Sequence, residues 1–163
     1  MTDLADQVAG LIKLNDGRIV GKTRLQKVAY LLEAKKLGMG IEFDYHNFGP
    51  FSEDLALAAD DAVALGFVHA NEQYGFHSVP YTIYSAAEKC PAFDSGDVRA
   101  RKSALNTMNE YSALVLELAA TAIYLKNNGY PQEYWNEVKR RKPLKATSEL
   151  ISSAKELNSR LKL

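Results

Sequence analysis

The stretch NFGPFSEDLALAADDAVALGFV, residues 47–68, decides the fold of this chain. Gly49-Pro50 is a dipeptide typical of turns. Ser52 is a good N-cap, and Glu53 and Asp54 after it suit the positive end of a helix dipole. Gly66 is a typical residue at the end of a helix. The apolar residues between them recur with helical spacing. We therefore predict a turn, a capped amphipathic helix and the first step of a strand.

Elements on both sides of this helix can be predicted in the same way. Amphipathic helices are expected over residues 3–14 and from a capping box at Thr23 to about Gly38. Alternation predicts a short strand over 41–48 and a β-hairpin over 67–88. A helix that leads directly into a hairpin is typical of the winged helix, although the usual winged helix has its first strand after its first helix. We predict an α+β fold with a winged-helix-like domain over residues 1–90.

Residues 97–163 are predicted to form a helical extension that packs on this domain. One long helix is expected over 98–127, a second over 131–141 and an amphipathic third over 147–161. Glu117 lies within an apolar run, where an unpaired buried carboxylate is costly. We expect it to meet an arginine or lysine from the last helices.

Charge is distributed unevenly along a chain whose net charge is zero. Residues 41–90 carry one basic and eight acidic side chains, so they are near −7, whereas residues 1–40 and 91–163 are near +3 and +4. Asymmetry of this kind carries information about binding partners rather than about the fold.

The helix after Ser52 carries the wrong charge for a DNA reader. Duplex binding depends on lysine and arginine against phosphate, and no such residue occurs between Lys36 and Lys89. The acids of this helix have three interpretations. They form a solvated face, or they form an acidic surface that binds a basic protein partner. A DNA contact is the interpretation that agrees least with their charge. We predict a protein partner, with a homodimer left open, and the expected partner-binding residues are Phe51, Glu53, Asp54, Asp60 and Asp61.

Four aromatic residues around the Gly-Pro turn have two interpretations. Core packing accounts for most of them, whereas an exposed pair would anchor a protein partner, because aromatic side chains concentrate binding energy. The four are Phe43, Tyr45, Phe48 and Phe51.

The basic run KRRKPLK, residues 139–145, supports the alternative function of a DNA-binding winged-helix regulator. Cations at a helix end are also favoured by its dipole, so a solvated terminus is the other interpretation. If the run contacts nucleic acid, the contacting residues are Lys139, Arg140, Arg141, Lys142 and Lys145.

No pattern in the sequence indicates catalysis. Cys90 has no histidine near it in sequence and is interpreted as a packed or surface thiol. His69 and His77 fall on opposite arms of the predicted hairpin and could face each other, but two imidazoles make an incomplete metal site. Phosphate-binding and zinc motifs are missing. We predict no enzymatic activity, no metal and no cofactor.

The single cysteine and the start of the chain indicate the compartment. One cysteine allows no internal disulfide, and the first residues lack the basic region of a signal peptide. The longest apolar stretch, residues 112–125, is too short for a membrane span and contains Glu117. We expect a cytoplasmic protein without a membrane partner.

Two segments carry a resemblance to known proteins. GRIVGKTRLQKVAYLLEAKKLG followed by FDYHNFGPFSEDLALAADDAVALGFV resembles the YwgA-like proteins and, more distantly, the Panacea domain of SocA-type antitoxins. The match covers residues 17–70, and the C-terminal helices are similar in style. The resemblance implies a bacterial or phage protein that acts by binding another protein, such as a toxin or a protease component. It supplies no catalytic residue.

Overall fold

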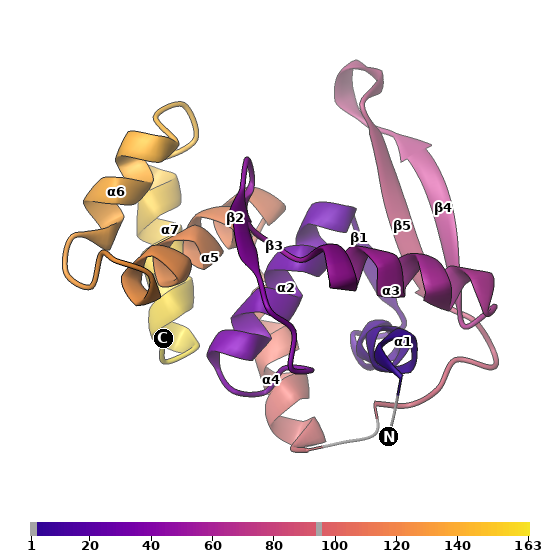
Figure 1. Ribbon diagram of the computed structural model, residues 1–163. Helices are drawn as coiled ribbons and strands as arrows, with labels where there is room; N and C mark the ends of the chain where they lie inside the picture. The colour runs from indigo at the N-terminus through magenta and orange to yellow at the C-terminus, as the bar shows by residue number, and fades with distance from the viewer. Residues whose placement is uncertain (1–2, 94–95) are drawn as a thin grey trace.

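The structure is a computed structural model that describes residues 3–93 and 96–163 (Figure 1). Within those residues the chain is a mixed α+β protein with two small antiparallel sheets. Its helices are α1 (Leu4–Leu14), α2 (Lys22–Ala34), α3 (Glu53–Ala64), α4 (Val98–Met108), α5 (Ala113–Asn127), α6 (Tyr134–Arg141) and α7 (Ser148–Arg160). Its strands are β1 (Arg18–Val20), β2 (Asp44–His46), β3 (Gly49–Phe51), β4 (Val68–Tyr74) and β5 (Pro80–Ala86), with a short 3-10 turn (Phe76–Ser78) before β5.

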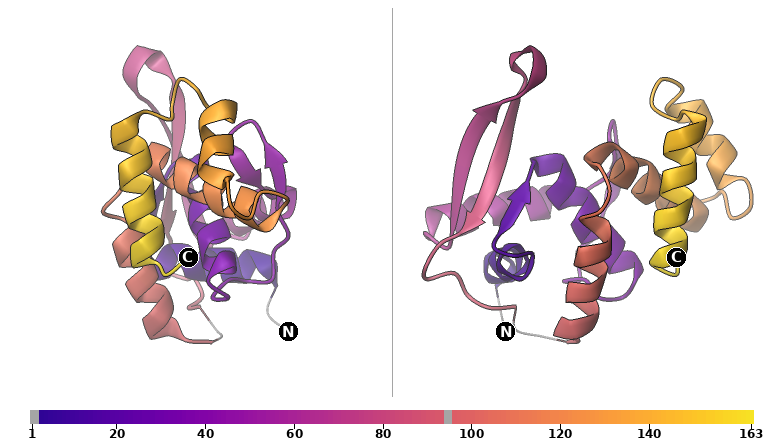
Figure 2. Two further views of the ribbon diagram at one scale, coloured as in Figure 1. Left: turned by 90° about the vertical axis from the view of Figure 1, so that its left-hand side faces the viewer. Right: turned by 180° about the vertical axis from the view of Figure 1, so that it is seen from behind.

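The larger sheet has the strand order β1-β5-β4. The predicted hairpin is confirmed as β4 and β5, which stand away from the rest of the molecule (Figures 1 and 2). Strand β1 was not predicted; it pairs with the base of β5, with Arg18 opposite Ser85. The element order is therefore α1, β1, α2, the small β2–β3 sheet, α3 and then the hairpin.

The smaller sheet corrects the predicted strand and turn. The strand expected over 41–48 is reduced to β2, and Gly49-Pro50 belongs to β3 instead of forming the turn. Asn47 and Phe48 connect the two strands, and His46 is paired with Gly49. This short hairpin places the Gly-Pro pair directly before α3.

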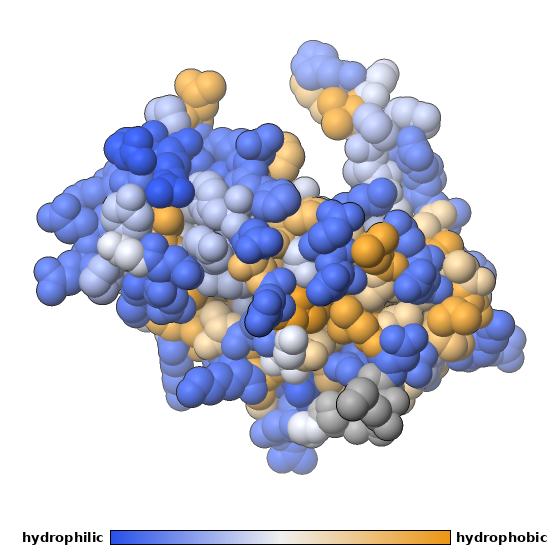
Figure 3. Space-filling model, in the orientation of Figure 1, coloured by the Kyte–Doolittle hydropathy of each residue, from blue (hydrophilic) through white to orange (hydrophobic). Residues whose placement is uncertain are grey.

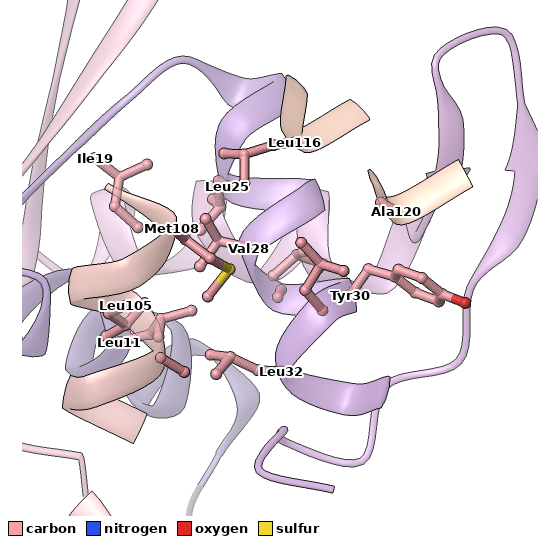
Figure 4. Close-up of a cluster of buried hydrophobic side chains, with 14 of the residues drawn as sticks. Leu11, Ile19, Leu25, Val28, Tyr30, Leu32, Leu105, Met108, Leu116 and Ala120 are labelled. Carbon is pink, nitrogen blue, oxygen red and sulfur yellow. The ribbon is translucent and has the colours of Figure 1, made fainter. Parts of the chain in front are cut away.

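Helix α2 lies at the centre of the core. Every residue from Leu25 to Leu32 is buried, and their side chains meet residues from α1, β1, α4 and α5 (Figure 4). Helix α5 packs on both α2 and β3. The core is therefore continuous between residues 3–93 and the C-terminal helices.

The C-terminal helices differ in detail from those predicted. The long helix expected over 98–127 is two helices, because Ser112 interrupts it and accepts a hydrogen bond from the Val115 N–H as the N-cap of α5. Helix α6 begins at Tyr134 and not at Pro131. Thr147 caps α7, close to the predicted start.

Candidate functional site

The start of α3 is held in place by α2. Ser52 Oγ accepts a hydrogen bond from the Leu55 N–H at 3.1 Å, as expected of an N-cap. The backbone of Ser52 also makes two hydrogen bonds of 2.9 Å with the buried amide of Gln26. Gln26 therefore does not complete the predicted capping box at Thr23, and α2 begins after Gly21 without a side-chain cap. The amide fixes the first turn of α3 against the core.

A buried lysine supports the Gly-Pro pair from the same helix. Lys27 is 1% exposed, and its Nζ donates a hydrogen bond of 2.6 Å to the Pro50 carbonyl oxygen. Burial lowers the pKa of this ammonium group to about 8, although Glu117 opposes the shift. On the other side of the pair, Gly49 has a φ of +88° and packs against Thr121 of α5.

Glu117 of α5 binds two lysines from the segment between α6 and α7, which confirms the expected pairing. Its Oε1 lies 2.7 Å from Lys142 Nζ, and both side chains are 5% exposed. Lys145 Nζ is 3.1 Å from the same oxygen. Lys142 also donates to the Asn47 carbonyl oxygen, at 3.2 Å. The β2–β3 hairpin is therefore held at its turn by Lys142 and at β3 by Lys27 of α2.

The solvent face of α3 has one large apolar side chain, with two acids on each side of it along the helix. Leu57 is 53% exposed, and the residues three and four positions before and after it are Glu53, Asp54, Asp60 and Asp61. Residues with this spacing are neighbours on a helix surface. All four acids are exposed, and none forms an ion pair with any residue that the structure describes. Figure 3 shows this face, with apolar surface among hydrophilic surface over α3.

Leu57 was not among the partner-binding residues predicted from the sequence. The signal was available, because the positions i±3 and i±4 around residue 57 are all acidic. We call Leu57 and these four acids the α3 face.

A pocket of about 380 Å³ lies beside the α3 face, between α2, α3 and the β2–β3 hairpin. Ala56 and Ala59 of α3 form one side of it, and Tyr84 of β5 also contributes. The Tyr84 hydroxyl has a raised pKa, mainly because of burial and also because Asp60 is near. The aromatic pair Phe48 and Phe51 and the charged residues Lys22, Glu53 and Asp60 also line it.

The structure divides the five predicted partner-binding residues into two groups. Phe51, Glu53 and Asp60 line the pocket. Asp54 and Asp61 lie farther round α3, outside the pocket lining, but on the same solvent face. Among the four aromatic residues near the turn, Phe48 is the most exposed, at 56%.

Two carboxylates, Glu117 and Glu137, pair with four of the five cations in the basic run 139–145. Glu137 binds Arg140 and Arg141 at N–O distances of 2.5 and 2.7 Å, which lowers the pKa of the carboxyl group to about 2. The Arg141 guanidinium also lies over the Tyr45 ring, 4.8 Å from its centre. Lys139 is exposed and has no carboxylate partner among the described residues. The four paired cations are Arg140, Arg141, Lys142 and Lys145.

The histidines and the cysteine are not brought together. His69 is paired with Ser85 in the hairpin, whereas His77 lies in the 3-10 turn at its tip, so the suggestion that they face each other is wrong. Cys90 is buried, its Sγ donates to the Ala9 carbonyl oxygen at 3.2 Å, and burial raises the pKa of its thiol. Within residues 3–93 and 96–163, no three side chains of His, Cys, Asp or Glu gather as metal ligands would.

None of the helices in the described residues has the length and apolar character needed to cross a membrane. The longest of them, α5, has 15 residues.

Comparison with known proteins finds a similarity to the uncharacterized protein YwgA of Bacillus subtilis (strain 168). The two are 27% identical over 112 residues, which make up 68% of this chain and 68% of YwgA. No family model and no solved structure matches the chain. The similarity supports the YwgA-like part of the resemblance seen in the sequence.

Proposed function

We propose that this chain is a non-enzymatic protein-interaction module that binds a basic protein partner through the α3 face. We further propose that the domain predicted over residues 1–90 is winged-helix-like. The sheet order β1-β5-β4 supports this, as does the element order apart from the β2–β3 hairpin inserted between α2 and α3. In that arrangement α3 takes the position of the recognition helix.

The observation that carries the proposal is the set of four unpaired carboxylates around the exposed Leu57. An apolar side chain that becomes buried at the centre of an interface contributes strongly to affinity, and the surrounding residues keep water away from it. Carboxylates on this rim attract lysine and arginine and increase the rate of association with a basic protein. The same carboxylates repel a phosphate backbone.

Nucleic acid binding by residues 139–145 is the alternative function, and the internal ion pairs of this run weigh against it. Lys142 is 5% exposed against Glu117 and would have to leave it to contact phosphate. Leaving Glu117 would also leave a buried carboxylate without its partner, which is costly.

The resemblance to SocA-type antitoxins suggests which kinds of partner to test. We propose a toxin or a component of a protease as the partner, with the chain acting as an antitoxin or adaptor in the cytoplasm of a bacterium or in a phage-infected cell. The partner is to be sought among the products of neighbouring genes and among proteins that co-purify with the chain.

The test is the capture of that partner by Glu53→Lys/Asp54→Lys. Reversing both charges should weaken binding at least about tenfold, equivalent to about 1.4 kcal/mol, without unfolding the domain. The matched control is Glu149→Lys/Glu156→Lys, which reverses two exposed acids on α7, one of them also in the first turn of its helix. Unchanged binding by a folded Glu53→Lys/Asp54→Lys would sink the proposal.

The same proteins can be tested for the alternative function. We expect no salt-dependent binding of a fluorescent DNA duplex to the wild type. A duplex bound at low salt, and released when residues 139–145 are neutralised, would favour the nucleic acid function instead.

A further inference from the structure

We infer that the pocket beside α3 binds one large apolar side chain of the basic partner, taken from a segment that has a lysine or arginine on each side of that residue. This inference rests on the proposed function and identifies the feature of the partner that the chain recognises.

The size and lining of the pocket suit a side chain better than a cofactor. Its volume of about 380 Å³ is near the lower end of the range for ligand pockets, about 300–1,000 Å³. The alanines of α3 and the rings of Phe48, Phe51 and Tyr84 present mainly apolar atoms. Lys27 is 1% exposed and already bonded to Pro50, so its ammonium group is not offered to a ligand.

The walls of the pocket are already held in position. The Phe51 ring stacks on His46 with 4.8 Å between ring centres, and Lys145 Nζ lies 4.7 Å from the centre of the Phe48 ring. Gln26 fixes the backbone at Ser52, between these rings and α3. A preformed pocket avoids part of the entropy cost of ordering side chains on binding.

The charges at the rim define what must lie next to the apolar side chain. Glu53 and Asp60 line the α3 side, whereas Lys22 of α2 is also part of the lining. Seven residues separate the two acids, which is about 10 Å along a helix. Partner cations about 10 Å apart on one face are seven residues apart in a helix.

The test uses two synthetic helical peptides of about 15 residues, each labelled with a fluorophore. Both carry arginines seven residues apart; one has phenylalanine three residues after the first arginine and the other has serine there. Burial of the phenylalanine should make the first peptide bind at least about tenfold more tightly to the wild type.

Two pairs of variants separate the pocket from the charges. Ala56→Phe fills the pocket without changing a charge and should remove the preference for phenylalanine, whereas Ala64→Phe, at the exposed far end of α3, should keep it. Glu53→Lys/Asp60→Lys should weaken both peptides at least about tenfold. Its control is again Glu149→Lys/Glu156→Lys, which has the same spacing of seven residues.

A second measurement requires no variant. In ¹⁵N-labelled wild-type protein, the phenylalanine peptide should shift the amide signals of Ala56, Ala59 and Tyr84 more than the serine peptide does. Equal affinity of the two peptides, or equal shifts at these amides, would overturn the inference. The proposed function would survive that result if Glu53→Lys/Asp54→Lys still lost its protein partner, so the two failures are distinguishable.

Discussion

Replacing Glu117 by glutamine should destabilise the protein by about 3–5 kcal/mol. The carboxylate and the Lys142 ammonium lie 2.7 Å apart, and both side chains are 5% exposed. Removing one partner of a buried ion pair leaves the other charge uncompensated, and a loss of this size is typical. Lys145 is 38% exposed and can turn towards water, so it adds little to the loss. With an unfolding entropy of about 2.1 cal/mol/K per residue, the melting temperature should fall by about 9–15 °C.

The assay is chemical and thermal unfolding followed by circular dichroism. Glu149→Gln, an exposed acid on α7, is the control and should stay within about 0.5 kcal/mol of the wild type. Glu117→Leu/Lys142→Met should recover most of the stability, because two apolar side chains can replace a buried ion pair at little cost. A folded Glu117→Gln within about 1 kcal/mol of the wild type would refute the reasoning, since it would mean that the pair is not buried as described.

Three further predictions concern the surroundings of the site. In the unfolded chain Lys27 has its ordinary pKa of about 10.5, whereas in the folded state its pKa is about 8. Between these two values the unfolded state binds more protons, so the free energy of unfolding rises with pH. Urea unfolding should show a rise of about 1–2 kcal/mol from pH 8 to 10, and Lys27→Met should lack it. Gly49→Ala should lower the free energy of unfolding by about 2–3 kcal/mol in the same assay, because the φ of +88° is strained for alanine and the added Cβ would press on Thr121. Gly40→Ala is the control: its φ is similar but its Cβ would meet open space, so the loss should be about 1 kcal/mol. Cys90 should react with a maleimide at least about tenfold more slowly in the native state than in urea, as followed by mass spectrometry, and equal rates would contradict its burial.

Local chemistry made the middle of the chain predictable. Ser52 and Gly66 lie at the two ends of α3. Each residue acts on backbone groups only a few positions away, so the start and the end of the helix can be predicted from local sequence. Strand β1 was not predictable in this way. It has only three residues, too few for an alternation pattern, and it is a strand because it pairs with β5, with Arg18 opposite Ser85.

The candidate site was predictable in its charge but not in its shape. The four acids of the α3 face follow from the sequence, and helical spacing places Leu57 between them. The pocket does not follow from spacing, because Phe48, Ala56 and Tyr84 come from three separate elements that meet only in the folded chain. The basic run was open to two interpretations partly for the same reason: Glu137 lies three and four positions from Arg140 and Arg141, but Glu117 is 25 positions from Lys142 and meets it only in the folded chain.

The hydrogen bond from Lys142 to Asn47 joins residues 95 positions apart, and it has a consequence for how the protein is made. A ribosome synthesises α3 well before α6, so the nascent chain carries its acidic helix next to a turn that Lys142 and Lys145 do not yet support. The proposed binding surface is complete only after nearly all of the polypeptide has been translated. Under the proposed function, prematurely terminated products would therefore compete poorly with the complete protein for the partner.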